Sequence, residues 1–217
     1  MTIETKASKG VDVKKLIVKC GVIPDEVVIA ELRTKGVLYD GPDHYVLQGG
    51  EHTNCFFYPF RVGMVVSLPL RLGQLLNDHI QDDQALAILA VSDTATRMMR
   101  SIYSAFDLKP KKVYPMNVSG KLELKPKQIE ALKQRPFIII DDVVRKGRIL
   151  QQVVEMCEDH QLTAEGIFCV INAGIPKIKG VPIHSLLEHP IQQWDPDDCP
   201  LCKSHSSPVY DPFHFKR

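Results

Sequence analysis

The sequence predicts a doubly wound α/β fold with a mainly parallel sheet, and three observations support this prediction. Phe137–Ile140 is a run of four apolar residues between Pro136 and an acidic pair, which is typical of a strand buried on both faces. Short apolar runs and helical periods alternate along most of the chain, as in folds whose strands are joined through helices. The segment after residue 147 has apolar residues at helical spacing, namely Ile149, Leu150, Val153, Val154 and Cys157.

The other expected elements follow from the same two periods. Pro24 begins a helix over residues 24–35, with Asp25 and Glu26 near its positive end and Gly36 after its last turn. The remaining predictions are helices over residues 68–80 and 98–106, and strands over 87–91, from Val113 onward, over 167–171 and over 183–187.

A small hood is expected before these helices and strands. Tyr45–Leu47 and Phe56–Tyr58 are apolar and aromatic segments on either side of residues 48–53, which contain Gly49 and Gly50. Two such segments around a glycine turn predict a β-hairpin-like unit.

Composition limits the classes of function. A chain of 217 residues is long enough for one domain with a sizeable core, and its net charge of +1 argues against duplex DNA or an anionic membrane as a partner bound by overall charge. No run approaches the ~18 apolar residues of a membrane span. The first ten residues are polar, so we expect no signal peptide. The six cysteines are scattered, which favours reduced thiols in a cytoplasmic protein over a disulfide framework.

Two adjacent carboxylates end the central strand. Asp141 and Asp142 follow it directly, and Gly147 lies in the short loop before the next helix. In an α/β sheet this order places both carboxylates at the carboxyl end of a strand and directs the free amides of the helix N-terminus into the same crevice. Such a place suits a phosphate on the amides and a hydroxyl-bearing sugar on the carboxylates. The simpler alternative is that acids near a helix N-terminus only favour its dipole.

The order of four apolar residues, Asp-Asp, two apolar residues, a two-residue loop and Gly resembles the phosphoribosyl pyrophosphate signature of type I phosphoribosyltransferases. Residues 44–53, running into Phe56 and Phe57, are similar to the N-terminal hood of orotate phosphoribosyltransferases. Residues 119–124 resemble the mobile active-site loop of an orotate phosphoribosyltransferase-like branch, and residues 194–202 resemble the Cys-Pro-Leu-Cys ending of that branch. The expected organisation is an N-terminal segment over 1–23, an α/β domain over 24–190 with its hood over 44–60, and a tail over 191–217.

The resemblance implies a cytoplasmic glycosyltransferase of nucleotide metabolism. It would transfer ribose 5-phosphate from phosphoribosyl pyrophosphate, with Mg²⁺, to a nitrogenous base or another acceptor and release pyrophosphate. Asp141 and Asp142 would serve the ribose centre, and the loop with Gly147 would wrap the 5′-phosphate. Arg97 and a mobile-loop lysine, here Lys121, would meet the diphosphate. The resemblance also implies a homodimer with no membrane partner.

Two hood residues bear on the acceptor base. Gln48 stands where orotate-specific members often have a lysine to meet the acidic base, so the resemblance does not favour orotate itself. Phe57, or its neighbour Phe56, would stack on the base as aromatic hood residues do in similar proteins. The alternative is that His52 and Phe57 pack inside the hood.

The sequence departs from the family pattern at the substrate contacts. Arg145, Lys146 and Arg148 replace the small hydroxyl residues of the usual phosphate loop. They either bind phosphate directly, since guanidinium groups bind its oxygens bidentately, or are solvated loop charges. Residues 92–97 lack the family's glycine and form either pocket lining or an ordinary helix start capped by Asp93 or Thr94. These departures favour an alternative function: a catalytically altered fold that binds a nucleotide or nucleic acid as a regulator, or acts as an effector subunit of a larger defence-type complex.

Cys199 and Cys202 form a Cys-x-x-Cys pair, which is half of a zinc site. The histidines considered as further ligands are His184, His189, His205 and His214. No second Cys-x-x-Cys pair exists, so a structural Zn²⁺ and a reduced pair that only closes the tail are both open interpretations.

Overall fold

The computed structural model describes residues 23–204, apart from short gaps at 42, 48, 59–60, 62–63, 66, 80–86, 106–112, 116 and 119–120. Its central element, within these residues, is a seven-stranded sheet in the order β12-β13-β11-β9-β5-β6, with β10 paired to β11. All neighbours in it run parallel except β12, which is antiparallel to β13. The strands are β5 (Ala87–Ala90), β6 (Val113–Pro115), β9 (Phe137–Ile140), β10 (Val143–Val144), β11 (Ile167–Asn172), β12 (Lys177–Ile178) and β13 (Val181–Glu188).

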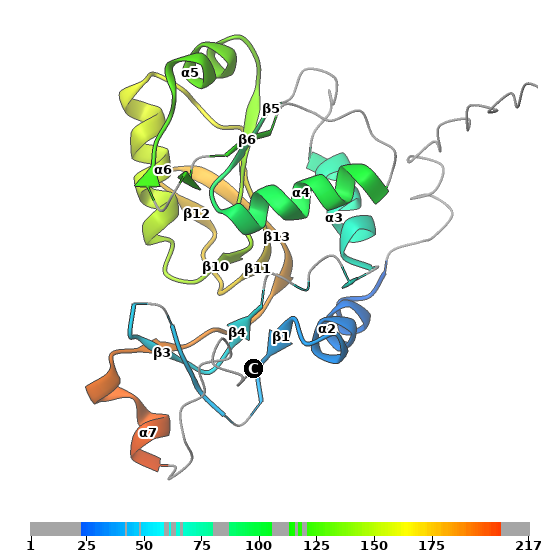
Figure 1. The fold of residues 1–217 in the computed structure, drawn as a ribbon, viewed down its shortest axis with the longest axis vertical. Helices are drawn as coiled ribbons and strands as arrows, with labels where there is room; N and C mark the ends of the chain where they lie inside the picture. The colour runs from blue at the N-terminus through cyan, green and yellow to red at the C-terminus, as the bar shows by residue number, and fades with distance from the viewer. Residues whose placement is uncertain are drawn as a thin grey trace, which may run out of the picture.

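Helices cover both faces of this sheet, because alternate strand residues point to opposite sides. In β9, Ile138 and Ile140 pack into the core that contains buried residues of α2 (Asp25–Thr34), α3 (Ser67–His79) and α4 (Asp93–Ala105). Phe137 and Ile139 pack on the other side, against α5 (Pro126–Lys133) and α6 (Arg148–Asp159). Figure 1 shows α5 and α6 on one side of the strands and α3 and α4 on the other. The predicted doubly wound α/β fold is therefore confirmed.

The hood is built differently from the predicted hairpin. β2 (Tyr45–Val46) pairs with β3 (His52–Thr53), whereas β4 (Phe56–Phe57) pairs with β1 (Leu38–Tyr39). The prediction that residues 45–47 and 56–58 form one hairpin is therefore wrong. The glycine turn is present: the amide of Gly50 donates to the carbonyl of Leu47 at 2.8 Å.

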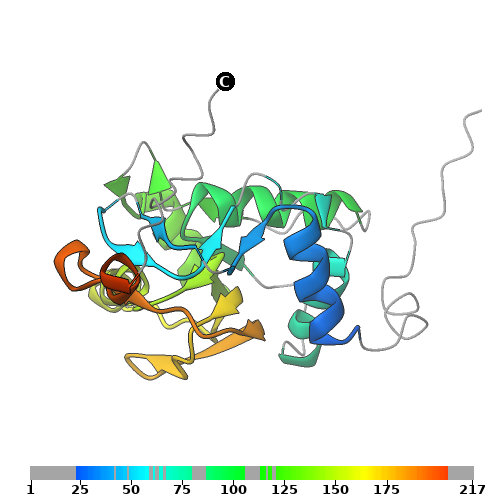
Figure 2. The same cartoon turned by 90° about the horizontal axis from the view of Figure 1, so that it is seen from below.

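The C-terminal tail returns to the hood and extends its sheet. β14 (Gln193–Trp194) pairs antiparallel with β3, so the order is β14-β3-β2. A 3₁₀ turn, η2 (Pro196–Asp198), and the short helix α7 (Pro200–Ser204) follow β14. Figure 2 shows α2 and α3 side by side at one end of the molecule and α7 at the other.

Most single elements agree with the sequence. α2 begins after Pro24 and buries Val28 and Leu32, and β5, β9, β11 and β13 lie where strands were expected. In α6, Leu150, Val153, Val154 and Cys157 are buried, but Ile149 is 54% exposed, so its assignment to the buried face is wrong. Ile149 is the second residue of the helix and precedes the part that rests on the sheet. Among the described residues, no helix is long and apolar enough to span a membrane.

Candidate active site at the carboxyl ends of the central strands

The acidic pair lies at the end of β9, in the middle of the sheet. The amide of Asp141 still donates to the carbonyl of Phe168 in β11, at 3.0 Å. The Asp141 side chain accepts from the Asp142 amide at 3.0 Å, and the Asp142 side chain accepts from the Val143 amide at 2.9 Å. Both carboxylates thus accept a hydrogen bond from the backbone of the turn that follows the strand.

Asp141 is buried, at 8% exposure, whereas Asp142 is half-buried. Burial, and then the neighbouring charge of Asp142, raise the pKa of Asp141 well above its ordinary value, although a hydrogen bond with Ser92 opposes the rise. Two carboxyl groups this close in a poorly solvated place cannot both ionise at little cost. The pair is therefore suited to a cation or to hydroxyl donors, which would stabilise its charged form.

Ser92 joins this pair from the end of β5. Its side-chain oxygen accepts a hydrogen bond from the Ala95 amide at 3.0 Å, so Ser92 is the cap of α4 and the predicted caps Asp93 and Thr94 are wrong. The same side chain lies against the Asp141 carboxyl. The start of α4 is thus both an ordinary helix N-terminus and part of the site. Arg97, further along α4, is exposed.

The loop after the acidic pair depends on Gly147. Its φ of +69° is left-handed, and a Cβ there would lie 2.6 Å from the end of the Ile178 side chain. The left-handed φ and this short distance both disfavour any residue larger than glycine unless the backbone or the Ile178 side chain moves. The carbonyl of Gly147 accepts the Gln151 amide at 2.9 Å and so begins α6. The amides of the first turn of α6 then lie just beyond the loop, as a phosphate site at a helix N-terminus requires.

Two of the three loop cations are held by the hood. The Glu51 carboxylate lies 2.9 Å from Nζ of Lys146 and 3.5 Å from a guanidinium nitrogen of Arg148. Gln193 of β14 donates a hydrogen bond to the other oxygen of Glu51. The hydrogen bond from Lys146 is the largest cause that holds the pKa of Glu51 below its ordinary value. Glu51 was not singled out from the sequence. It connects the turn between β2 and β3 to residues 145–148, which we call the phosphate-type loop.

Arg145 has different surroundings. Its guanidinium lies close enough to the buried thiol of Cys55 to lower the pKa of that thiol, which burial nevertheless raises to about 12. The Nε of Arg145 is buried and has no hydrogen-bond partner among the described residues. A buried donor without a partner is costly, so this side chain is the loop cation best prepared to receive an anion.

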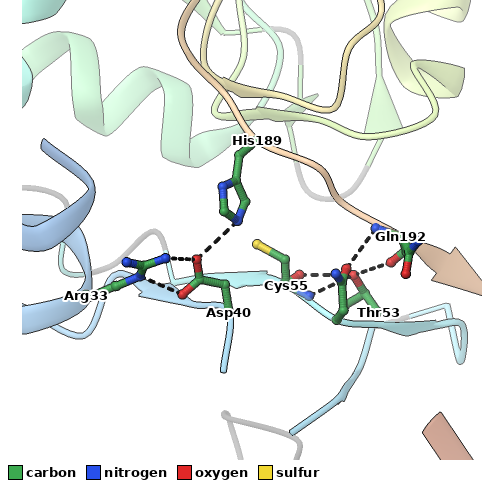
Figure 3. Close-up of polar contacts among 7 residues, drawn as sticks. Arg33, Asp40, Thr53, Cys55, His189 and Gln192 are labelled. Carbon is green, nitrogen blue, oxygen red and sulfur yellow. Dashed lines mark hydrogen bonds and ion pairs between the residues drawn. The ribbon is translucent and has the colours of Figure 1, made fainter. Parts of the chain in front are cut away.

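Figure 3 shows two groups of polar contacts near the strand ends, one around Asp40 and one around Thr53. Arg33 binds Asp40 through two nitrogens, at 2.8 and 2.6 Å, and His189, just beyond β13, approaches the same carboxylate at 3.1 Å. The Arg33 hydrogen bond is the main reason that the pKa of Asp40 is lowered. The Thr53 hydroxyl donates to the carbonyl of Gln192 at 2.8 Å and links β3 to the tail.

The remaining predicted site residues lie in several places. Phe57 is 4% exposed and belongs to the hydrophobic core, as does Cys55. Lys121 begins β8 (Lys121–Leu122), which pairs with β7 (Asn117–Val118) in a hairpin. Gln48 lies outside the described residues. The structure thus brings Asp141, Asp142 and the loop 145–148 together, but does not describe a contact between them and Gln48 or Lys121.

Four side chains with metal-ligating atoms meet between the hood and the tail. The ligating atoms of His44, His52, Cys199 and Cys202 all lie within 4.8 Å of one another. The prediction that His184 or His189 completes the set is wrong, because His184 packs on the Phe168 ring and His189 pairs with Asp40. The other two candidates, His205 and His214, lie outside the described residues.

The only signal in the sequence for His44 and His52 was their position on either side of a glycine turn. In the observed hairpin, Val46 faces His52, so His44 and His52 are diagonal neighbours on one face of the ribbon. Their meeting with Cys202, 158 and 150 positions away, depends on the pairing of β14 with β3.

Comparisons with known proteins agree with this architecture. The chain is 23% identical to the orotate phosphoribosyltransferase of Thermotoga maritima over 173 residues, which is 79% of this chain and 90% of that protein. It is 19% identical to the orotate phosphoribosyltransferase of Caldicellulosiruptor bescii over 161 residues, 74% of this chain and 83% of that protein. No protein-family profile matches the chain.

Solved structures show the same fold. The orotate phosphoribosyltransferase of Aeropyrum pernix superposes with a TM-score of 0.51 at 17% identity, over 73% of this chain and 92% of that one. The UMP synthase of Leishmania donovani gives a TM-score of 0.52 at 15% identity, over 74% of this chain and 35% of that one. The chain is thus similar in sequence, over most of its length, to orotate phosphoribosyltransferases, and it shares the fold of type I phosphoribosyltransferases.

Proposed function

We propose that this protein transfers ribose 5-phosphate from phosphoribosyl pyrophosphate to a nitrogenous base and releases pyrophosphate. The observation that carries the proposal is the acidic pair, buried Asp141 and half-buried Asp142, at the carboxyl end of β9, followed by a left-handed glycine and the N-terminus of α6. This arrangement places carboxylates that can bind a sugar close in the chain to amides that can bind a phosphate.

The roles of the residues follow from their chemistry. The bond to the departing diphosphate breaks at the anomeric carbon of ribose, where positive charge develops, and carboxylates stabilise such a centre. Asp141 and Asp142 would hold the ribose hydroxyls beside it. The amides after Gly147 and the guanidinium of Arg145 would bind the 5′-phosphate. Arg97 and Lys121 are proposed to meet the diphosphate as it leaves.

The acidic pair also fits a magnesium ion. Mg²⁺ prefers oxygen ligands and is usually bound through one or two carboxylates together with substrate phosphates. Asp141 and Asp142 supply such oxygens, and a cation beside them would oppose the burial and the charge repulsion that raise the pKa of Asp141. When bound, the ion would neutralise charge on the departing diphosphate.

The acceptor is proposed to be a base other than orotate. Gln48 carries no positive charge, whereas an acidic base such as orotate calls for a cation. The Phe57 ring lies in the core, so stacking on the base is better assigned to a residue other than Phe57.

Release of pyrophosphate tests the function directly. The protein should release pyrophosphate from phosphoribosyl pyrophosphate and Mg²⁺ when it is supplied with the correct member of a panel of purine and pyrimidine bases, orotate included. Isothermal titration without a base should show binding of phosphoribosyl pyrophosphate. Absence of both binding and turnover in folded protein would refute the proposed function. Binding of phosphoribosyl pyrophosphate without turnover would refute catalysis and indicate a protein that only senses this ligand.

Glu51→Gln is expected to tighten the binding of a phosphate ester. The carboxylate of Glu51 partly neutralises Lys146 and Arg148, and its removal frees both cations for phosphate. Exposed ion pairs contribute about 0.2–1 kcal/mol, so the affinity for ribose 5-phosphate should rise up to about fivefold. Titration calorimetry at pH 7.5 or so measures the change.

The matched control is Glu155→Gln. Glu155 lies on α6, away from the loop, and pairs with Lys179. It should leave the affinity unchanged. Because the pKa of Glu51 is lowered below its ordinary 4.5, the contact is intact at neutral pH and is lost only as the pH falls below that value. Weaker binding by the Glu51 variant would mean that Glu51 positions the loop for phosphate instead of competing with it.

A further inference from the structure

A group of two histidine and two cysteine side chains, three of them buried and Cys202 more exposed, has no role in the proposed phosphoribosyl transfer. His44 is 2% exposed, His52 is 9% exposed and Cys199 is fully buried. Cys202 completes the group from the first turn of α7. Histidine rings and thiols are borderline-soft ligands that suit zinc and do not suit Mg²⁺ or Ca²⁺. The composition Cys₂His₂ is that of structural zinc sites.

The distances match a single bound ion. Sγ of Cys202 lies 3.1 Å from Nε2 of His44 and 3.2 Å from Nδ1 of His52, and the two rings are 5.4 Å apart between centroids. In a tetrahedron with the usual Zn–S and Zn–N bond lengths, neighbouring ligand atoms lie about 3.3–3.8 Å apart. All four ligating atoms lie within 4.8 Å of one another, so small side-chain movements complete the tetrahedron.

We propose that His44, His52, Cys199 and Cys202 bind one Zn²⁺ in a closed tetrahedral site that joins the hood to the C-terminal tail. All four positions are filled by protein side chains, which is the arrangement of structural sites, because a catalytic zinc keeps a position open. Zinc binding at this site does not depend on phosphoribosyl transfer.

Zinc would connect two segments that lie far apart in the sequence. His44 and His52 belong to the β2–β3 hairpin, whereas Cys199 and Cys202 follow β14 at the far end of the chain. The backbone link between them is the short pairing of β14 with β3, supported by the hydrogen bond from Thr53 to Gln192. Two-residue strands are weak on their own, so a cross-link here would supply much of the stability of the hood.

The site also has a structural connection to the phosphate-type loop. Glu51 lies directly before His52, in the turn of the same hairpin, and pairs with Lys146 and Arg148. Gln193, which donates to Glu51, belongs to β14. Zinc would therefore fix both the hairpin that carries Glu51 and the strand that carries Gln193, and so stabilise the contact between the hood and the phosphate-type loop.

Metal analysis of the full chain, purified without added metal, should find about one zinc per chain. Replacement of zinc by Co²⁺ should give the intense visible absorption of tetrahedral cobalt together with thiolate-to-metal charge transfer. Removal of the metal with a chelator should lower the melting temperature by roughly 10 °C, since a tightly bound ion stabilises only the folded state.

Variants distinguish ligands from bystanders. Cys199→Ser and His52→Ala should lose zinc, whereas His52→Cys keeps four suitable ligands and should retain it. Cys157→Ser and His184→Asn are matched controls outside the cluster and should keep one zinc per chain. If a variant fails to fold, the cobalt spectrum of the unmodified protein still tests the proposal. Folded protein that binds neither zinc nor cobalt, or a Cys199–Cys202 disulfide in freshly purified protein, would overturn it.

Discussion

Replacing Asp141 and Asp142 together with asparagine is expected to lower the affinity for phosphoribosyl pyrophosphate at least ~100-fold while the protein stays folded. Hydrogen bonds to a charged group contribute about 1.5–3 kcal/mol each, so the loss of two charged acceptors removes about 3 kcal/mol or more. Isothermal titration with phosphoribosyl pyrophosphate and Mg²⁺, and with ribose 5-phosphate alone, measures the effect.

The same substitution should not destabilise the protein at neutral pH and should raise its melting temperature. The pKa of Asp141 is raised in the folded state, chiefly by burial and next by the charge of Asp142. A raised carboxyl pKa stabilises the fold most below its ordinary pKa of 3.8, and this contribution is lost as the pH rises through the raised value. Asparagine does not titrate, so the advantage of the variant should grow as the pH rises over this interval.

Thermal unfolding of the wild-type protein and the variant over a series of pH values checks this sign. Asp159→Asn combined with Asp197→Asn is the matched control, because both of these carboxylates are exposed and lie away from the strand ends. The control should change neither the affinity nor the pH dependence. An acidic-pair variant that binds ribose 5-phosphate as tightly as the wild type would show that the ligand pocket lies elsewhere.

Alanine at Arg145, Lys146 and Arg148 together is expected to give the second large loss of sugar-phosphate binding. Each lost charge-assisted hydrogen bond removes about 1.5–3 kcal/mol, and less where solvent screens the pair. The three contributions should differ: the Arg148 side chain is 69% exposed, whereas Arg145 has a buried Nε without a hydrogen-bond partner in the described residues. Arg145→Ala alone should therefore account for most of the effect in titration calorimetry.

Salt dependence separates a phosphate pocket from a nucleic-acid surface. Binding of ribose 5-phosphate should weaken modestly with salt, whereas a nucleic acid held by this loop would show a slope approaching one unit per neutralised phosphate. Alanine at Lys35, Lys133 and Lys177 removes the same charge from other elements and is the matched control. If the loop variant loses single-stranded RNA or DNA but keeps the sugar phosphate, the loop serves nucleic acid.

Restoring Thr-Thr-Gly-Gly-Thr across residues 145–149 tests the loop from the opposite direction. Gly147 stays in place, so its left-handed conformation is preserved. Equal or tighter binding of phosphoribosyl pyrophosphate would identify a modified enzyme pocket. Loss of binding by this variant alone would show that the cations have taken over the role of the hydroxyl groups.

The centre of the fold was predictable because its signals are local in the sequence. Four apolar residues before an acidic pair identified β9, and the apolar spacing from Leu150 to Cys157 identified α6. Successive strand residues point to opposite faces, and residues on one helix face recur every three or four positions. Such patterns therefore predict which residues are buried even when the element that packs against them is unknown. The order of strand, carboxylates, glycine and helix likewise predicted that Asp141 and Asp142 lie at the carboxyl end of a central strand.

Tertiary structure alone decided how the hood is paired and what it contacts. Phe56–Phe57 pairs with Leu38–Tyr39 instead of closing the expected hairpin, because two-residue strands carry too little pattern to specify a partner. Glu51 meets the phosphate-type loop from 95 residues away. His44 and His52 meet Cys199 and Cys202 because β14 adds to β3, a pairing between distant segments made by backbone hydrogen bonds that leave no mark in the sequence.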